Sequence, residues 1–365
     1  MKNIILSLGL IFFVTIVFLF ADILIAAGAF KKIKPHGAIK SQKLQLPVAG
    51  PEDLTLDSIS GNLYISADDR RSNQQQTDKI KGAILLINLN DTLQKLKNIT
   101  PAAPSDFHPH GIALWKADSG RTILLAVNHR SKEKLHTIER FEVINDSLIH
   151  LESISDMTLM SSPNDLVATG PRTFYVTNDH YYADEGINRT LEDYLQRAIS
   201  YVNYYDGKTF RKVATNIAYA NGIQGNADRS EIYVASTTGR KILVFKSDKQ
   251  TGLLELQNEI FTATGVDNIE TDGDGNLWIG CHPQLLKFVA HATSAKNYSP
   301  SQVIRIKLKP DGSYQQEEIF LNDGQEYSGS TTGIIFKGNL YIGSVFESTL
   351  LRVVIDDKSS SQHPY

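Results

Sequence analysis

Polar side chains, most of them carboxylates and amides, recur along this chain at intervals of roughly 45 to 63 residues. Each stands in an otherwise apolar or glycine-containing segment. The series runs Glu52-Asp53, His110, Asn164-Asp165, Asn221, Asp267-Asn268 and Ser330. Carboxylate and amide oxygens suit Ca²⁺, which takes about six to eight hard ligands in an adaptable geometry. Zinc instead favours a tetrahedral group of His and Cys. The pattern therefore predicts a calcium site.

The polar positions share one place in a repeated strand pattern. About ten residues after each of them, a turn residue precedes a short β-rich run, as in Gly275-Asn276-Leu277-Trp278-Ile279-Gly280. The six copies of this run are residues 61–66, 121–126, 172–177, 230–235, 275–280 and 338–343. Their spacing brackets the length of a four-stranded propeller blade. The chain is therefore predicted to be all-β, with a six-bladed β-propeller.

The propeller explains how distant polar residues could meet. The strand before each copy would be the innermost strand of its blade, so six equivalent positions would point toward one axis and form a central calcium-binding tunnel. Asn-Gly and Asp-Asn pairs are also common turn residues. That alternative accounts for any single pair better than for all six positions at one phase of the repeat.

The N-terminus is expected to form a hydrophobic helix that precedes the propeller. Residues 4–21 are almost all apolar, a length that fits a membrane span. Ala27-Gly28-Ala29 has the small-x-small pattern of a cleavage site, so a cleaved signal and a retained anchor both stay open. Lysines at 31, 32 and 34 favour a cytoplasmic flank, which leaves the orientation open as well.

The chain is expected to divide into four parts. Residues 1–30 are the signal or anchor, 31–46 a linker, 47–357 the propeller and 358–365 a polar tail. The best helical pattern after the anchor is at 188–205, where apolar residues fall at helical spacing.

Composition narrows the partners. The net charge is -3 and no long basic run occurs, which argues against a nucleic-acid partner. The single cysteine, Cys281, excludes an intrachain disulfide. Neither feature indicates an oligomeric state.

Several motifs resemble the paraoxonase/arylesterase family in order and spacing. They are Gly50-Pro51-Glu52-Asp53-Leu54, His108-Pro109-His110-Gly111-Ile112, Val127-Asn128-His129, Pro163-Asn164-Asp165-Leu166-Val167, Thr177-Asn178-Asp179-His180-Tyr181, Tyr219-Ala220-Asn221-Gly222-Ile223, Val266-Asp267-Asn268-Ile269 and Trp278-Ile279-Gly280-Cys281-His282-Pro283. The resemblance extends from about residue 46 to 355 and is specific because the motifs occur together.

The resemblance implies a six-bladed propeller with two Ca²⁺ ions in its tunnel. The catalytic ion would be held by Glu52, Asn164, Asn221, Asp267 and Asn268. The structural ion would be held by Asp53, Asp165 and the backbone carbonyl of Ile112. Two carboxylates at each site would balance one divalent cation.

The implied activity is calcium-dependent hydrolysis of lactones and aryl esters. His110 resembles the family's general base and His129 its supporting partner, while Asp267 is a competing base or nucleophile. The implied location is membrane-anchored or secreted, with the propeller outside the cytoplasm. The main alternative is a non-catalytic, membrane-anchored chaperone or binding protein of the same fold. A one-metal lactonase propeller fits less well, since three of the polar positions are doubled.

Overall fold

In the computed structural model, which describes residues 2–75, 80–131, 135–183, 186–309 and 311–355, short strands succeed one another along nearly the whole chain. The innermost strands are β2 (Pro51–Asp57), β6 (Pro109–Lys116), β10 (Pro163–Ala168), β14 (Ala220–Gly225), β18 (Gly265–Thr271) and β22 (Ser330–Phe336). The second strands are β3 (Asn62–Ala67), β7 (Thr122–Arg130), β11 (Phe174–Asn178), β15 (Glu231–Ser236), β19 (Leu277–His282) and β23 (Asn339–Ser344).

The outer half of each sheet is formed by two further strands. The third strands are β4 (Ala83–Asn88), β8 (Leu135–Ile144), β12 (Ser200–Tyr205), β16 (Lys241–Ser247), β20 (Ser301–Leu308) and β24 (Thr349–Val354). The outermost are β5 (Lys97–Asn98), β9 (Ser147–Ile154), β13 (Phe210–Ile217), β17 (Leu254–Phe261), β21 (Tyr314–Asn322) and β1 (Lys40–Gln45).

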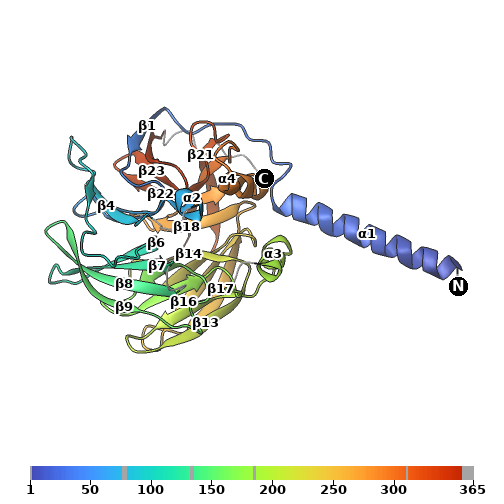
Figure 1. Cartoon of the computed structure of the whole chain (residues 1–365), viewed down its shortest axis with the longest axis horizontal. Helices are drawn as coiled ribbons and strands as arrows, with labels where there is room; N and C mark the ends of the chain where they lie inside the picture. The colour runs from blue at the N-terminus through green and yellow to red at the C-terminus, as the bar shows by residue number, and fades with distance from the viewer. Residues whose placement is uncertain (1, 76–79, 132–134, 184–185, 310, 356–365) are drawn as a thin grey trace.

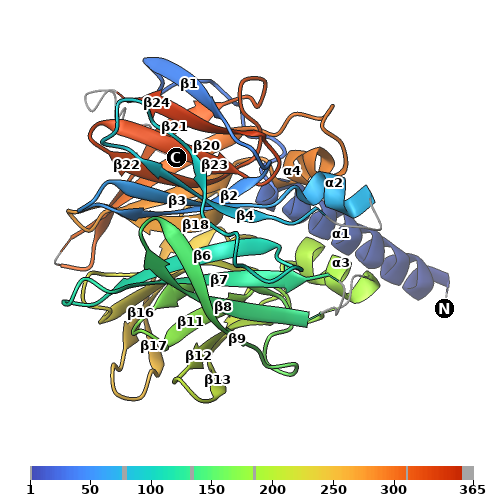
Figure 2. The ribbon, with the colours of Figure 1, turned by 60° about the vertical axis from the view of Figure 1, so that its left-hand side comes forward.

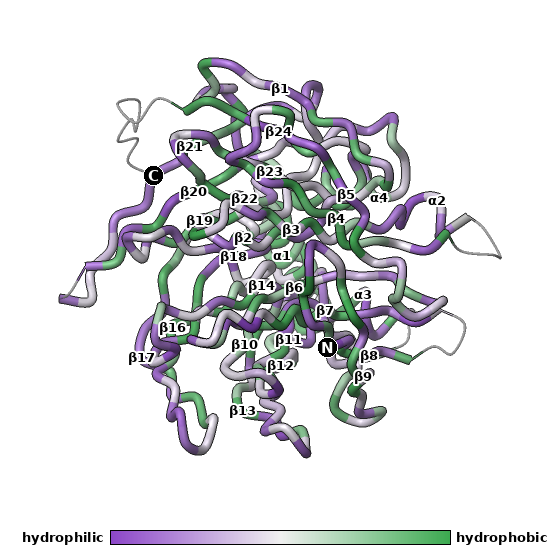
Figure 3. The backbone as a smooth tube through the Cα atoms, turned by 90° about the vertical axis from the view of Figure 1, so that its left-hand side faces the viewer, coloured by the Kyte–Doolittle hydropathy of each residue, from purple (hydrophilic) through white to green (hydrophobic). Residues whose placement is uncertain are grey.

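These strands form six sheets of four antiparallel strands each within the described residues. Every innermost strand contacts the innermost strands of the two adjacent sheets, so the ring is closed. Viewed from the side opposite the N-terminal helix, the inner strands lie around the centre of the molecule (Figure 3). The predicted six-bladed β-propeller is confirmed.

The second strands coincide with the six repeated runs of the sequence. They are almost wholly buried, because each blade is covered on both faces by its neighbours. A strand buried on both faces reads as a continuous apolar run rather than an alternating one. Leu125 and Val176, which come from neighbouring blades, share one buried cluster.

The ring is closed by pairing the two ends of the chain. Strand β1 pairs with β24 in the sixth blade, in a register from Lys40↔Val354 to Gln45↔Thr349. Since the chain has a single cysteine, the two ends are joined without a disulfide. The expected linker at 31–46 is wrong in its second half, because residues 40–45 form strand β1. Apart from Leu44, which packs against a core cluster, the side chains of β1 are polar and mostly exposed, so the strand joins the fold mainly through its backbone.

Four helices occur in the described residues: α1 (Lys2–Ala26), α2 (Arg70–Gln75), α3 (Ile187–Tyr194) and α4 (Leu285–Thr293). Helix α1 extends away from the propeller (Figure 1), and the other three lie around its base at one end of the molecule (Figure 2). Its segment Ile4–Ala26 is long and apolar enough to cross a membrane.

The helix expected at 188–205 is wrong in its second half. Helix α3 ends at Tyr194, and Ser200–Tyr205 is β12, the third strand of its blade. The reason is tertiary: this aromatic segment is buried on both faces between neighbours, which favours a strand. The predicted tail at 358–365 lies outside the described residues.

Candidate active site

A β-bulge opens each of the six innermost strands. The register of β2 shifts between Pro51 and Asp53, and that of β6 between Pro109 and Ile112. The other four inner strands have the same irregularity near their first residues. A bulge turns a side chain out of the regular pleat, and here it turns one polar side chain per blade toward the axis.

The six bulge residues line a cavity of about 560 Å³ at the end of the tunnel near the helices. They are Glu52, His110, Asn164, Asn221, Asp267 and Thr331. The sixth position is thus Thr331, not Ser330 as the sequence spacing predicted. The hydroxyl of Ser330 donates instead toward the carbonyl oxygen of Gln302 on β20, in the preceding blade. The prediction is off by one residue because a bulge shifts the side-chain register at this point, and the spacing of strands in the sequence does not reveal a bulge.

A second layer of side chains lies beside this ring. The residue after the bulge position is polar in four blades, at Asp53, Asp165, Asn268 and Thr332, and glycine in the other two, at Gly111 and Gly222. A Cβ atom on Gly111 would lie 2.4 Å from Oδ1 of Asp165. One on Gly222 would lie 2.6 Å from Cα of Asn268. Glycine therefore allows the side chains of the next blade to approach the axis.

Four buried oxygens around the axis accept no hydrogen bond among the described residues. They are Oε2 of Glu52 and the Oδ1 atoms of Asn164, Asn221 and Asn268. The amide nitrogens of the three asparagines are used elsewhere: they donate to Asp179, Thr237 and Glu52. These hydrogen bonds orient each amide group, and its oxygen accepts no hydrogen bond from the described residues. Buried oxygens without partners are costly unless a cation or donor meets them.

The two deeper carboxylates connect neighbouring blades. Asp53 accepts a hydrogen bond from the backbone N–H of Ile112 at 2.7 Å, and Asp165 accepts one from that of Ile223 at 2.8 Å. Burial, and then the charges of Asp165 and Glu52, raise the pKa of Asp53 well above its ordinary value. Burial likewise raises the pKa of Asp165. Crowded buried carboxylates of this kind are relieved by a bound cation.

The donor set is oxygen-rich and mixed. All seven side chains expected as ligands are at most 5% exposed, namely Glu52, Asp53, Asn164, Asp165, Asn221, Asp267 and Asn268. In the described part of the chain, no group of three or more His, Cys, Asp and Glu is arranged to hold a metal. The ring therefore depends on its amides, which fits a hard cation such as Ca²⁺.

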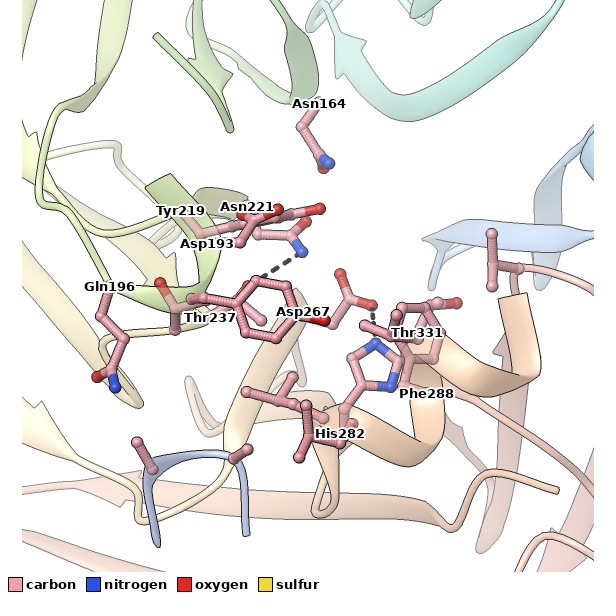
Figure 4. Close-up of a pocket in the computed structure, with 18 of the residues that line it drawn as sticks. Asn164, Asp193, Gln196, Tyr219, Asn221, Thr237, Asp267, His282, Phe288 and Thr331 are labelled. Carbon is pink, nitrogen blue, oxygen red and sulfur yellow. Dashed lines mark hydrogen bonds and ion pairs between the residues drawn. The ribbon is translucent and has the colours of Figure 1, made fainter. Parts of the chain in front are cut away.

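Asp267 is held by a histidine. Nε2 of His282 lies 2.8 Å from Oδ2 of Asp267 (Figure 4), and the ring of His282 stacks on Phe288 with centroids 3.8 Å apart. Burial raises the pKa of Asp267, although His282 opposes the shift. His282 therefore lines the cavity and contacts Asp267, one of the expected ligands.

His110 and His129 lie side by side, as expected. Nδ1 of His110 is 2.8 Å from Nε2 of His129, and Nε2 of His110 is 3.5 Å from Oε1 of Glu52. Burial, reinforced by the charges of His110 and His136, lowers the pKa of His129 well below its ordinary value. His129 is therefore neutral near pH 7. Only His110 of this pair lines the cavity.

Residues of all four described helices line the mouth of the cavity, with Arg70 contributed by α2. Ile23, Ala26 and Ala27 line it at the end of α1, Leu285 and Phe288 on α4, and further residues on α3. The carbonyl oxygen of Ala27 accepts the N–H of Leu285 at 2.9 Å. The base of the apolar helix is thus part of the cavity wall.

An ion pair fixes α3 to the propeller. His180 lies between Asp179, at 2.7 Å, and Asp193 of α3, at 2.9 Å. Burial opposes its protonation, but the charge of Asp179 and the hydrogen bonds to both carboxylates raise the pKa of His180 to about 9. His180 is not among the residues that line the cavity. It supports the cavity mouth by holding α3 against the propeller.

The fold and the axial cavity define a six-bladed β-propeller with an oxygen-rich ring. Among solved structures, a gluconolactonase from Xanthomonas campestris is similar with a TM-score of 0.54, 14% identity, and coverage of 88% of this chain and 95% of that chain. A putative gluconolactonase gives a TM-score of 0.53 and 16% identity, with coverage of 90% and 95%. These likenesses show the fold.

Sequence comparison shows the family. The arylesterase family model matches residues 72–352. Human serum paraoxonase/arylesterase 1 is 36% identical over 275 residues, which are 74% of this chain and 76% of that protein. Rabbit serum paraoxonase/lactonase 3 is 32% identical over 282 residues, with coverage of 75% and 77%. The chain belongs to the paraoxonase/arylesterase family.

Proposed function

We propose that this protein is a calcium-dependent hydrolase of lactones and aryl esters. The observation that carries the proposal is the set of four unpaired buried oxygens around the tunnel axis. Such a set is costly in an empty pocket and favourable around a divalent cation. The names of the relatives, arylesterase and lactonase, support the same substrate classes.

Two groups of ligands are proposed. Glu52, Asn164, Asn221, Asp267 and Asn268 would hold the catalytic ion, and Asp53, Asp165 and the carbonyl of Ile112 the structural one. The N–H of Ile112 already faces Asp53, and in an extended strand the carbonyl of a residue points to the same side as its N–H. When bound, the catalytic Ca²⁺ would polarise the substrate carbonyl and stabilise its developing negative charge.

The protein's own residues would supply the proton transfer. In this proposal His110 takes a proton from the attacking water, because its ring lines the cavity beside the ligand ring. His129 supports it from behind through the 2.8 Å contact. Asp267 remains the competing base or nucleophile. Its Oδ2 already accepts from His282, which reduces its basicity.

The cavity wall fits a partly apolar ester or lactone. Leu285, Phe288 and Val289 of α4 and Tyr194 of α3 face the same space as the polar ring. A substrate would place its carbonyl at the ring and its apolar part against these helices.

Helix α1 is proposed to attach the protein to a membrane. Its large apolar side chains are exposed along most of its length, for example Phe12 and Phe18, and its base lies at the cavity mouth. In this arrangement the cavity would open toward the membrane that holds the helix.

Equilibrium calcium binding to the full chain in detergent micelles tests the ligand assignment. The proposal predicts two ions per chain, with E52Q weakening one and D53N weakening the other. As a control, Asp274→Asn, on an exposed turn, should bind like the wild type. A chain that binds no calcium with high affinity, or variants that weaken neither ion, would refute the assignment.

A further inference from the structure

The segment that leads into His110 is held from the neighbouring blade. His110 is on β6 of the second blade, whereas the residues between β3 and β4 belong to the first. Oδ1 of Asp68, which follows β3, lies 2.9 Å from Nδ1 of His108. Arg70, the first residue of α2, donates from Nη2 to the carbonyl oxygen of Pro109 at 2.9 Å. The two residues that precede His110 are therefore both bonded to the first blade.

The same two segments are also closely packed. The N–H of Gly82, which precedes β4, donates to the carbonyl oxygen of Phe107 at 2.8 Å. A Cβ atom on Gly82 would lie 2.5 Å from Cδ of Pro109. Steric contact therefore adds to the hydrogen bonds in fixing the start of β6.

The contact between Asp68 and His108 is part of a buried polar network. Each of the two residues is 5% exposed. Nε2 of His108 lies 3.2 Å from Oδ1 of Asp106, and Nδ2 of Asn73 on α2 donates to Oδ1 of Asp68 at 3.1 Å. Buried polar groups that find partners rigidify the segments that carry them. None of these four residues lines the cavity, so the network acts from behind it.

Asp68 also contacts the segment that leads into Glu52. Its N–H donates to the carbonyl oxygen of Gly50 at 3.3 Å. A Cβ atom on Gly50 would lie 2.3 Å from the carbonyl oxygen of Asp68, and the φ of Gly50 is 74°, which suits glycine. Asp68 thus holds the segment before the proposed ligand through its backbone and the segment before the proposed base through its side chain.

We propose that Asp68 and Arg70 are positioning residues of the hydrolytic site: they hold the segment before His110 and thereby fix this histidine relative to Glu52. The proposal rests on the proposed function for the roles of His110 and Glu52. A displaced base is a poor base, because proton transfer requires hydrogen-bond distance. Arg70 lines the cavity and Asp68 does not, so Asp68 allows the test that is free of direct contact with substrate.

The first test is the hydrolysis of phenyl acetate by Asp68→Ala and Asp68→Asn. Alanine removes the bond to His108 but keeps the backbone bond to Gly50. The kcat of D68A should therefore fall about tenfold, while KM and the affinity for calcium stay within about twofold. Asparagine keeps an oxygen that can accept from His108, so it should restore kcat to within about threefold of the wild type.

The matched control is Asp272→Ala. Asp272 follows β18 and accepts hydrogen bonds from the backbone N–H of Asn276 and from Nε1 of Trp278. It does not line the cavity. D272A should therefore lose hydrogen bonds, as D68A does, and keep the kcat of the wild type.

A second pair of variants tests the same segment through Arg70. Arg70→Met removes the donor to the carbonyl of Pro109 and should lower kcat about tenfold, whereas Arg70→Lys retains a donor and should keep most of the rate. Because both residues hold one segment, the loss in the double variant D68A/R70M should be smaller than the product of the single losses. If D68A does not fold, R70M against R70K makes the comparison alone.

NMR of the full chain in micelles, labelled with ¹⁵N-histidine, tests the positioning without turnover. The ring signals of His110, assigned with H110Q, should move in D68A and stay in place in D272A. Unmoved His110 signals in D68A would overturn the proposal.

The outcomes separate this proposal from the proposed function. A wild-type kcat in D68A, or equal losses in D68A and D68N, would overturn the positioning role. Equal losses of kcat and calcium affinity in D68A would do the same, because they would show general damage to the fold. An inactive wild type would refute the proposed function instead, and the NMR result would still decide whether Asp68 positions His110.

Discussion

Nε2 of His110 lies 3.5 Å from Oε1 of Glu52. The pair of His110 and His129 therefore meets the ring of proposed oxygen ligands at Glu52. Both side chains come from bulges that open innermost strands of adjacent blades. A water in the cavity that contacts both groups would be next to the proposed base and next to the proposed cation site. Separate predictions follow for the histidines and for the proposed calcium ligands.

On the histidine side, His110→Gln should lower kcat for lactones and aryl esters by about 10²-fold or more, because the general base is lost. Calcium binding should be unchanged, since His110 is not a proposed ligand. Initial rates and calcium titrations check the two parts. His36→Gln should leave both intact, and full activity in H110Q would remove His110 from the mechanism.

On the ligand side, Asp267→Ala should raise the calcium concentration needed for half-maximal activity by about tenfold or more and should lower the maximal rate. The reason is that a buried carboxylate next to the proposed ion is removed. The calcium dependence of hydrolysis measures both effects, with Asp274→Ala as the control. An unchanged calcium dependence would contradict the ligand assignment.

His180 should make stability depend on pH. Its folded pKa of about 9 exceeds the ordinary value of 6.5, so its contribution is complete below about pH 6.5 and is lost as the pH rises through 9. The contribution corresponds to about 3 kcal/mol at most. Urea unfolding at pH 6 and pH 10, with calcium present, should show a larger fall in unfolding free energy for the wild type than for H180Q. Equal falls would show that the ion pair with Asp179 and Asp193 does not stabilise the protein.

Closure of the ring by β1 should matter for stability. A fragment that begins at Lys40 keeps the strand that pairs with β24, whereas one that begins at Pro47 lacks it. The shorter fragment should melt roughly 10 °C lower or fail to fold, because the sixth blade loses its outer strand and the ring its closure. Thermal unfolding followed by circular dichroism compares the two. Equal melting temperatures would mean that β1 contributes nothing to closure.

Much of the fold could be predicted from the sequence, because each second strand is buried on both faces and reads as a continuous apolar run after a turn residue. Strand β1 could not be predicted, since five of its six side chains are polar and Leu44 alone packs against the core. Ser200–Tyr205 was misread because helical spacing over a few residues competes poorly with burial between two neighbouring strands.

The site was predictable where residue type alone carries the chemistry, as for Glu52 and Asn164. Thr331 was missed by one residue, because a bulge shifts the side-chain register without a mark in the sequence. His136, whose Nδ1 lies 2.9 Å from that of His129, was not singled out from the sequence, because the pairing of the two residues across strands is a feature of the fold.

The most direct test of the proposed function is hydrolysis by the full chain in detergent micelles, with calcium and after its removal by a chelator. Phenyl acetate and a series of lactones are the substrates, and circular dichroism follows the fold in the same samples. The account predicts turnover with calcium, loss of turnover on chelation, and recovery when calcium is restored before the protein unfolds. A folded, calcium-loaded protein that hydrolyses none of these substrates would contradict it and would favour the non-catalytic binding role.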